Sequence, residues 1–152
     1  MIALPEKTES VGVIPTGSLA AGVLRAQESA HALRDVGSLK RVATDLIETA
    51  AQIGCRHMVA ANAAAEPLAT AAALLSEGAL TFSDKAHSLD KVLVVEAATV
   101  SGDVARSCAA DLRANGASWV GVVIYDRVRP DLDGLDDEPA IDFVTSLQTL
   151  SQ

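Results

Sequence analysis

The residues best suited to bind a small anion lie in one stretch near the middle of the chain. Four apolar residues at 92–95 lead into Glu96, and a turn of small residues that contains Gly102 then opens a predicted helix. This pattern is typical of a buried parallel strand that delivers a loop to a ligand at its carboxyl end. Backbone N–H groups and hydroxyls in such a loop can hold a phosphate, assisted by the following helix N-terminus.

The elements that must position this loop alternate between helix and strand. Apolar periodicity, cap residues and turn residues place the boundaries. The expected order begins with a helix over 38–53, with Ser38 as N-cap and Gly54 as its end, a strand over 56–61, a helix over 67–75, a strand over 80–83 and a strand from 92. A helix follows whose apolar face runs over 104–112 and which stops at Asn115 and Gly116, then a strand over 119–125, a last strand over 141–144 and a short helical tail. Such alternation predicts an α/β fold with a central parallel sheet and helices on both faces.

Two segments are harder to assign. Residues 18–33 are rich in alanine, which favours a helix, although their apolar periodicity is poor. Residues 129–139 carry many acids and read as an exposed loop, without the regular ligand positions of an EF-hand. His31 and His57 have no partners at metal-ligand spacing, so we expect no metal site of the protein's own.

Composition limits the classes of function. The chain has 152 residues, which suits one domain, and its 49% hydrophobic but 3% aromatic content predicts a core of Ala, Val, Leu and Ile. A net charge of −8 argues against nucleic acid and anionic membranes as partners. We found no signal peptide and no apolar run near the roughly 20 residues of a membrane span, which predicts a cytoplasmic protein. Without a CxxC pair, Cys55 and Cys108 read as buried, reduced thiols.

The stretch from Val92 to Asp103 resembles the phosphoribosyl-diphosphate (PRPP) motif of the type I phosphoribosyltransferases. In that motif a buried strand runs into two acids, two apolar residues and a Thr-Thr-Gly turn. Further segments at 13–18, 125–127 and 144–150 make the chain most similar to the orotate phosphoribosyltransferase branch. The resemblance implies one domain over 1–152, with an N-terminal hood over about 1–35 and a core over about 36–152. It also implies a homodimer, and an extended conformation at 20–25.

Family enzymes transfer a phosphoribosyl group from PRPP to a base nitrogen, with Mg²⁺ bridging the ribose hydroxyls and the pyrophosphate. The first acid of the motif corresponds to Glu96, but Ala97 stands where the second acid belongs. Loss of one charged hydrogen bond costs ~1.5–3 kcal/mol. By the resemblance, Mg²⁺ would bind here only together with PRPP.

The phosphate loop departs from the family pattern at several positions. Its equivalents are Thr99, Val100, Ser101, Gly102, Asp103 and Val104. Val100 and Val104 replace hydroxyl residues, and Asp103 brings a negative charge to a loop meant for a dianion. At about 4 Å and an effective dielectric near 20, each like-charge pair costs on the order of 4 kcal/mol before screening. Alternatively, Asp103 caps the helix that follows, a role that acids favour.

Two further family loops are also altered. The pyrophosphate loop corresponds to Asn62, Ala63 and Ala64, where alanine tolerates positive φ poorly and Asn62 is the single polar contact. The mobile catalytic loop is reduced to a short connection over 83–91. In it, Lys85 and His87 are either remnants of the family's basic cluster or solvated loop residues.

Together these departures predict a degenerate orotate phosphoribosyltransferase-like protein with weak or no transferase activity and a binding or regulatory role. The alternative is an active enzyme that uses PRPP and Mg²⁺ to phosphoribosylate a nucleobase, with missing groups supplied by a partner chain. A third possibility is a binder of phosphate-free small molecules in the former base pocket. The expected ligands are accordingly a nucleotide, a phosphoribosyl compound or a nucleobase.

Overall fold

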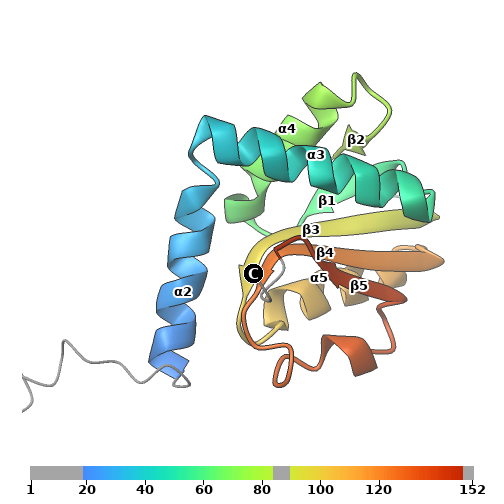
Figure 1. The fold of residues 1–152 in the computed structure, drawn as a ribbon. Helices are drawn as coiled ribbons and strands as arrows, with labels where there is room; N and C mark the ends of the chain where they lie inside the picture. The colour runs from blue at the N-terminus through green and yellow to red at the C-terminus, as the bar shows by residue number, and fades with distance from the viewer. Residues whose placement is uncertain (1–18, 84–89, 149–152) are drawn as a thin grey trace, which may run out of the picture.

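A computed structural model of the protein describes residues 19–83 and 90–148. In these residues a parallel sheet has the strand order β2-β1-β3-β4-β5 (Figure 1). The strands are β1 His57–Ala60, β2 Thr81–Phe82, β3 Lys91–Thr99, β4 Trp119–Arg127 and β5 Phe143–Ser146. Valine and isoleucine dominate β3 and β4, because β-branched side chains pack well on a pleated surface that is covered on both faces.

Helices cover both faces of the sheet. The helices are α2 Leu19–Ala32, α3 Val36–Ile53, α4 Glu66–Leu75 and α5 Asp103–Ala114, with short 3-10 turns η1 Ala63–Ala65 and η2 Leu135–Asp137. Figure 1 shows α3 and α4 on one side of the sheet and α5 on the other. Leu46 of α3 and Leu68 of α4 join one buried cluster, whereas Ala105 and Ala109 of α5 join another. The predicted α/β class with a parallel sheet between helices is confirmed. None of the described helices is both long and apolar enough to cross a bilayer.

The start of α3 differs from the prediction. Asp35, not Ser38, occupies the N-cap: its carboxylate accepts a hydrogen bond from the Ser38 backbone N–H at 2.9 Å. This contact holds the pKa of Asp35 below its usual range. Gly54 ends the helix in the left-handed conformation, at φ 70°, as predicted.

The N-terminal expectation from the resemblance is wrong for residues 20–25. They lie inside α2 and are helical rather than extended, in agreement with their alanine content. Gly22 is the buried residue of this helix, and it packs against the side chains of Val100 and Val128. The expected segment at 13–18 lies outside the described residues, as do Lys85 and His87.

Several strand boundaries also differ, among them the end of β4, which runs to Arg127 instead of residue 125. β3 continues past residue 95 to Thr99, so Glu96 lies within the strand rather than at its tip. The last strand is Phe143–Ser146, two residues beyond the predicted end. Leu147 and Gln148 are not helical, because their N–H groups donate to the carbonyls of Ile124 and Tyr125 and extend the pairing with β4.

Candidate functional site

The sheet topology itself points to one edge for a ligand. β1 and β3 are neighbours, and the chain leaves β1 through α4 on one face but leaves β3 through α5 on the other. In open α/β sheets, ligands bind outside the carboxyl ends of strands at such a switch point. The turn after β3 and the segment after β1, which the sequence singled out, meet at this place.

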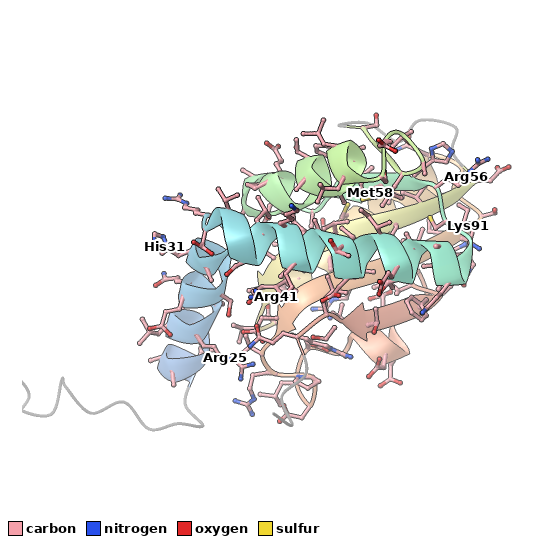
Figure 2. The ribbon with its side chains drawn as sticks, turned by 45° about the horizontal axis from the view of Figure 1, so that its top comes forward. Arg25, His31, Arg41, Arg56, Met58 and Lys91 are labelled. Carbon is pink, nitrogen blue, oxygen red and sulfur yellow. The ribbon has the colours of Figure 1, made fainter. Side chains whose placement is uncertain are left out.

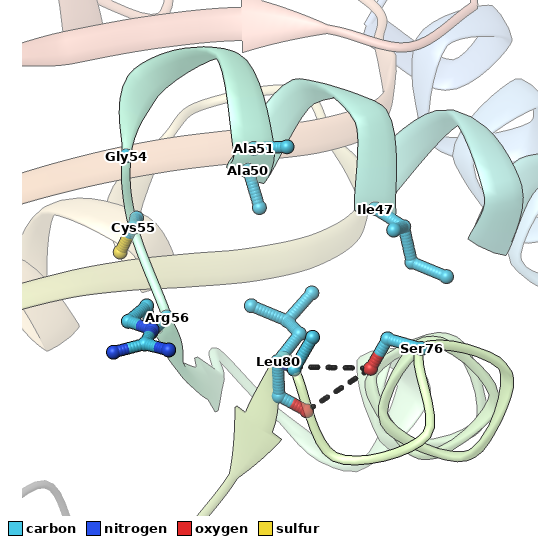
Figure 3. A pocket seen from close by; sticks show the side chains of 9 residues that line it. Ile47, Ala50, Ala51, Gly54, Cys55, Arg56, Ser76 and Leu80 are labelled. Atoms are coloured by element: carbon cyan, nitrogen blue, oxygen red, sulfur yellow. Dashed lines mark hydrogen bonds between the residues drawn. The ribbon is translucent and has the colours of Figure 1, made fainter.

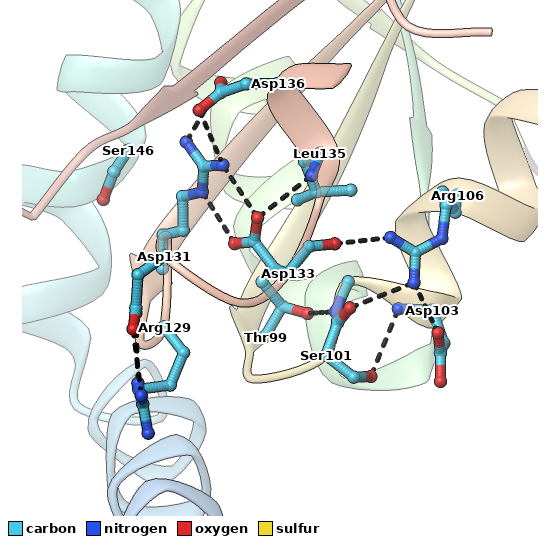
Figure 4. Close-up of polar contacts among 12 residues, drawn as sticks. Thr99, Ser101, Asp103, Arg106, Arg129, Asp131, Asp133, Leu135, Asp136 and Ser146 are labelled. Carbon is cyan, nitrogen blue, oxygen red and sulfur yellow. Dashed lines mark hydrogen bonds and ion pairs between the residues drawn. The ribbon is translucent and has the colours of Figure 1, made fainter. Parts of the chain in front are cut away.

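The turn after β3 satisfies its own donors. Gly102, at φ 78°, precedes α5, and its N–H donates to the Thr99 hydroxyl at 2.9 Å (Figure 4). The Asp103 N–H donates to the Ser101 hydroxyl at 3.3 Å. Asp103 is the first residue of α5 rather than its cap, and its acid suits the positive end of the helix dipole. These two N–H groups are therefore already engaged within the turn.

A second layer covers the same turn. The Arg106 guanidinium donates to the carbonyls of Asp133 and Ser101 and to the Asp103 carboxylate, the last at 2.5 Å (Figure 4). At Gly102, an added Cβ would lie 2.7 Å from the Asp133 carbonyl oxygen and 3.0 Å from the Leu135 side chain. The turn is thus packed against the segment that follows β4.

Most of that segment is exposed, as the sequence predicted, but two residues in the middle of it are buried. Asp133 and Leu135 are wholly buried. The Arg127 guanidinium donates to both Asp133 oxygens, at 2.7 and 2.8 Å, and the Leu135 N–H donates to Oδ1 at 3.0 Å. These bonds compensate for burying the Asp133 charge, and they raise the pKa of Arg127. We call residues 128–138 the cap segment.

Glu96 and Ala97, the equivalents of the family's acid pair, face opposite sides of the sheet. Ala97 packs in the cluster beneath α3 and α4, whereas Glu96 lies toward α5, near enough to Cys108 for its charge to affect that thiol. Glu96 is 2% exposed, and among the described residues its Oε1 has no hydrogen-bond partner. Burial, and then the charge of Asp133, raises the pKa of Glu96 to about 7.

A pocket of about 370 Å³ opens at the switch point, between Ala61 after β1 and the first turns of α5. Asp103, Ser107, Cys108 and Asp111 supply its polar side chains, and no basic residue of the described chain lines it. Burial, followed by the charges of Asp111 and Glu96, raises the pKa of Cys108 to about 11. The thiol is therefore neutral at pH 7, and the charges lining the pocket are negative.

The pyrophosphate-loop equivalents form η1 and the residue before it. Asn62 is extended and makes no side-chain cap, and the described residues show no positive φ at Ala63 or Ala64. Ala63 and Ala64 line a separate pocket of about 340 Å³ beside His31 and Arg34. The strain expected of alanine here is therefore absent.

Helix α2 covers the carboxyl end of β4. Arg25 donates to both carboxylate oxygens of Asp126, at 2.9 and 2.6 Å, and the Ser29 hydroxyl donates to the same group at 2.5 Å. In the sequence, Asp126 and Arg127 stand out only through the family resemblance at 125–127, and no local pattern marks Arg25, Arg106 or Asp133. An acid followed by an arginine at a strand end was the available signal. The partner of Asp126 is 101 residues away, whereas Asp133, the partner of Arg127, is six residues away among several other acids.

The remaining candidates do not form a site. His57 Nδ1 lies 2.8 Å from the Thr81 hydroxyl, an exposed pair. Cys55 and Cys108 are free thiols, the first buried and the second half-buried. Within the described residues, no group of three His, Cys, Asp or Glu side chains is placed to hold a metal ion. No known protein-family model matches this chain, and no curated protein matches it.

Proposed function

We propose that this protein is a phosphoribosyltransferase-like domain, nearest the orotate branch, that lacks transferase activity and binds a phosphate-free small molecule. One observation carries the proposal: the turn after β3 is closed by its own hydroxyls, by Arg106 and by the cap segment. A 5′-phosphate would have to displace these contacts. It would also meet the Asp103 carboxylate, which sits in the first turn of α5.

The carboxylates are also poorly arranged for Mg²⁺ and the ribose of PRPP. Glu96 is buried beneath α5, and Asp126 is held by Arg25 and Ser29. A hard divalent cation needs several oxygen ligands that converge on one point. The described residues do not provide such a group, so we derive no reaction step through the metal.

The switch-point pocket fits a ligand that donates hydrogen bonds. Asp103 and Asp111 can accept from N–H groups, and the Ser107 hydroxyl can accept or donate. A nucleobase or nucleoside offers such donors on a flat, partly apolar body without a phosphate charge. We therefore infer a nucleobase or nucleoside as the ligand class.

Calorimetry with four ligands tests this function. We expect saturable heat from a free base such as uracil or from uridine, and none from PRPP with Mg²⁺ or from ribose 5-phosphate. Orotate-dependent release of pyrophosphate from PRPP would instead establish the active-enzyme alternative. Tight PRPP binding without turnover would also contradict the proposal, because it requires an open phosphate turn.

A pair of variants on α5 locates the binding. Ser107→Leu fills the pocket and should weaken base or nucleoside binding by about tenfold or more, since the larger side chain displaces the ligand and removes a hydroxyl partner. Ala110→Leu adds the same side chain at an exposed position of α5 that does not line the pocket. Equal binding by both variants would place the ligand elsewhere.

The homodimer implied by the resemblance belongs to the same proposal. Light scattering of the purified chain, measured over a range of concentrations, tests it directly. A monomer at all concentrations would remove the dimer from the proposal without changing the expected ligand.

A further inference from the structure

A further pocket lies at the amino edge of the sheet, at the opposite end of the strands from the switch point. Figure 2 shows the two ends, with Arg25 and His31 at one and Arg56 and Lys91 at the other. The last turns of α3, the start of β1 and the α4–β2 connection enclose about 330 Å³ (Figure 3). We call this the amino-edge pocket.

Small residues keep this space empty. Further along the α3–α4 interface, Leu46 and Leu68 are wholly buried and fill the gap between the helices. At its C-terminal end α3 instead presents Ala50 and Ala51 (Figure 3). With Ile47 and Leu80 these alanines give the pocket an apolar lining.

One wall of the amino-edge pocket is held in a strained conformation. Glu77 has φ 54°, and among the described residues it is the one non-glycine residue with positive φ. The Ser76 hydroxyl braces this turn, because it donates to the Ala73 carbonyl at 3.1 Å and accepts from the Leu80 N–H at 3.1 Å. Strained residues persist where the surrounding structure over-determines them, and they cluster at binding sites. We therefore expect this wall of the amino-edge pocket to have the same conformation with and without a ligand.

The charge at the mouth of the pocket is positive. Arg56 is exposed, and within the described part of the chain its guanidinium has no hydrogen bond or ion pair (Figure 3). Its neighbour Lys91 is occupied, since it donates to the Ile53 carbonyl at 2.5 Å and lies 4.8 Å from the Trp119 ring centroid. Burial raises the pKa of Cys55, which keeps this thiol neutral. No acid is among the described residues that line the space.

We propose that the amino-edge pocket binds a small apolar monocarboxylate. The apolar body packs against Ile47, Ala50 and Leu80, and the carboxylate accepts paired hydrogen bonds from the Arg56 guanidinium, a geometry that arginine favours. The volume lies at the lower end of the roughly 300–1,000 Å³ of ligand pockets. This site is separate from the switch-point pocket and does not depend on the proposed function.

Titrations monitored by methyl NMR test the proposal with octanoate, octylamine and 1-octanol, which share a chain and differ in charge. Octanoate should shift the methyl signals of Ala51 and Leu80 saturably, and octylamine should bind at least about tenfold more weakly because Arg56 repels it. Arg56→Gln should weaken octanoate by a similar factor and leave 1-octanol unchanged. Equal affinity for octanoate and octylamine would overturn the proposal.

Two leucine variants on α3 separate the pocket from general adsorption. Ala51→Leu fills the pocket from an exposed position, so the fold should tolerate it while octanoate binding is lost. Gln52→Leu adds an apolar side chain at the next position, which does not line the pocket, and should leave binding unchanged. If Ala51→Leu binds octanoate as well as the unmodified protein, the ligand does not occupy this space.

Discussion

Glu96 is a carboxyl group whose protonation is coupled to folding. In the folded protein its pKa is raised to about 7 from the usual 4.5. Between these pH values the unfolded chain has released the proton that the folded protein still holds, so stability falls as the pH rises, by on the order of 3 kcal/mol in total. We expect Glu96→Gln, which mimics the neutral acid, to lose this contribution to the pH dependence.

Urea unfolding at pH 5 and pH 8 measures the effect. The substitution should raise stability relative to the unmodified protein more at pH 8 than at pH 5. Glu48→Gln, on the exposed side of α3, controls for the loss of one negative charge. An identical effect of Glu96→Gln at both pH values would mean that Glu96 does not titrate in this range.

The substitution Gly102→Ala adds a single Cβ and so tests whether the cap segment packs closely on the turn after β3. Ala at this position would have the strained φ of 78° and would also press against the Asp133 carbonyl. Gly116, at φ 105°, has nothing within 4 Å of an added Cβ, so Gly116→Ala carries backbone strain alone. We expect Gly102→Ala to destabilise the protein by roughly 1–3 kcal/mol more, the usual cost of overpacking. Equal unfolding midpoints would show that the cap segment does not press on the turn.

At the scale of the elements, helices and strands were predictable because their local signals agree with their burial. The helix over 38–53 was found from its apolar spacing and Gly54, and the valine-rich strands from their composition. The N-cap was misplaced because Ser38 and Asp35 both suit that position, and only the contact between them decides.

The cap of α3 gives a prediction at this scale. Asp35→Ala removes the acceptor of the Ser38 N–H, so it should lower the urea midpoint and expose the first turn of α3 to hydrogen exchange. Ser38→Ala keeps that N–H and should have the smaller effect. If Ser38→Ala lowered the urea midpoint more than Asp35→Ala, Ser38 rather than Asp35 would be the N-cap.

For the whole molecule, specific side-chain contacts decided what the sequence pattern could not reveal. Residues 129–139 look like a solvated loop because their acids are many, yet Arg127 and the Leu135 N–H allow Asp133 to be buried. Likewise Arg25 reaches Asp126 across the fold, a pairing that no local pattern specifies. The predicted segments after β1 and β3 do lie together at the carboxyl edge of the sheet, but their role in binding stays a prediction. Helix α2 and the cap segment, which cover that edge, were not foreseen.

Helix α2 and the cap segment should differ in their stability against local opening, and native-state hydrogen exchange can measure this difference. The cap segment is tied into the sheet, because the Val128 N–H donates to the Thr99 carbonyl and Leu135 is wholly buried. Its amides should exchange with those of β3 and β4. Helix α2 buries only Gly22 fully, and its Arg25 and Ser29 side chains bind Asp126, so its amides should exchange by local opening at lower free energy.

A variant makes this difference measurable. Arg25→Ala leaves the buried Asp126 carboxylate with the Ser29 hydroxyl as its remaining side-chain partner, so it should speed exchange in 19–32 by about tenfold or more without changing exchange in 128–138. Arg34→Ala, an exposed arginine just after α2, serves as the matched control. Amides of the cap segment that exchange as fast as those of a free loop, or faster in Arg25→Ala than in the unmodified protein, would show that this segment does not close the carboxyl edge of the sheet. That result would also contradict the proposed function. If instead only α2 opens, the turn after β3 stays covered by the cap segment even when the helix detaches, which is what the proposed lack of transferase activity requires.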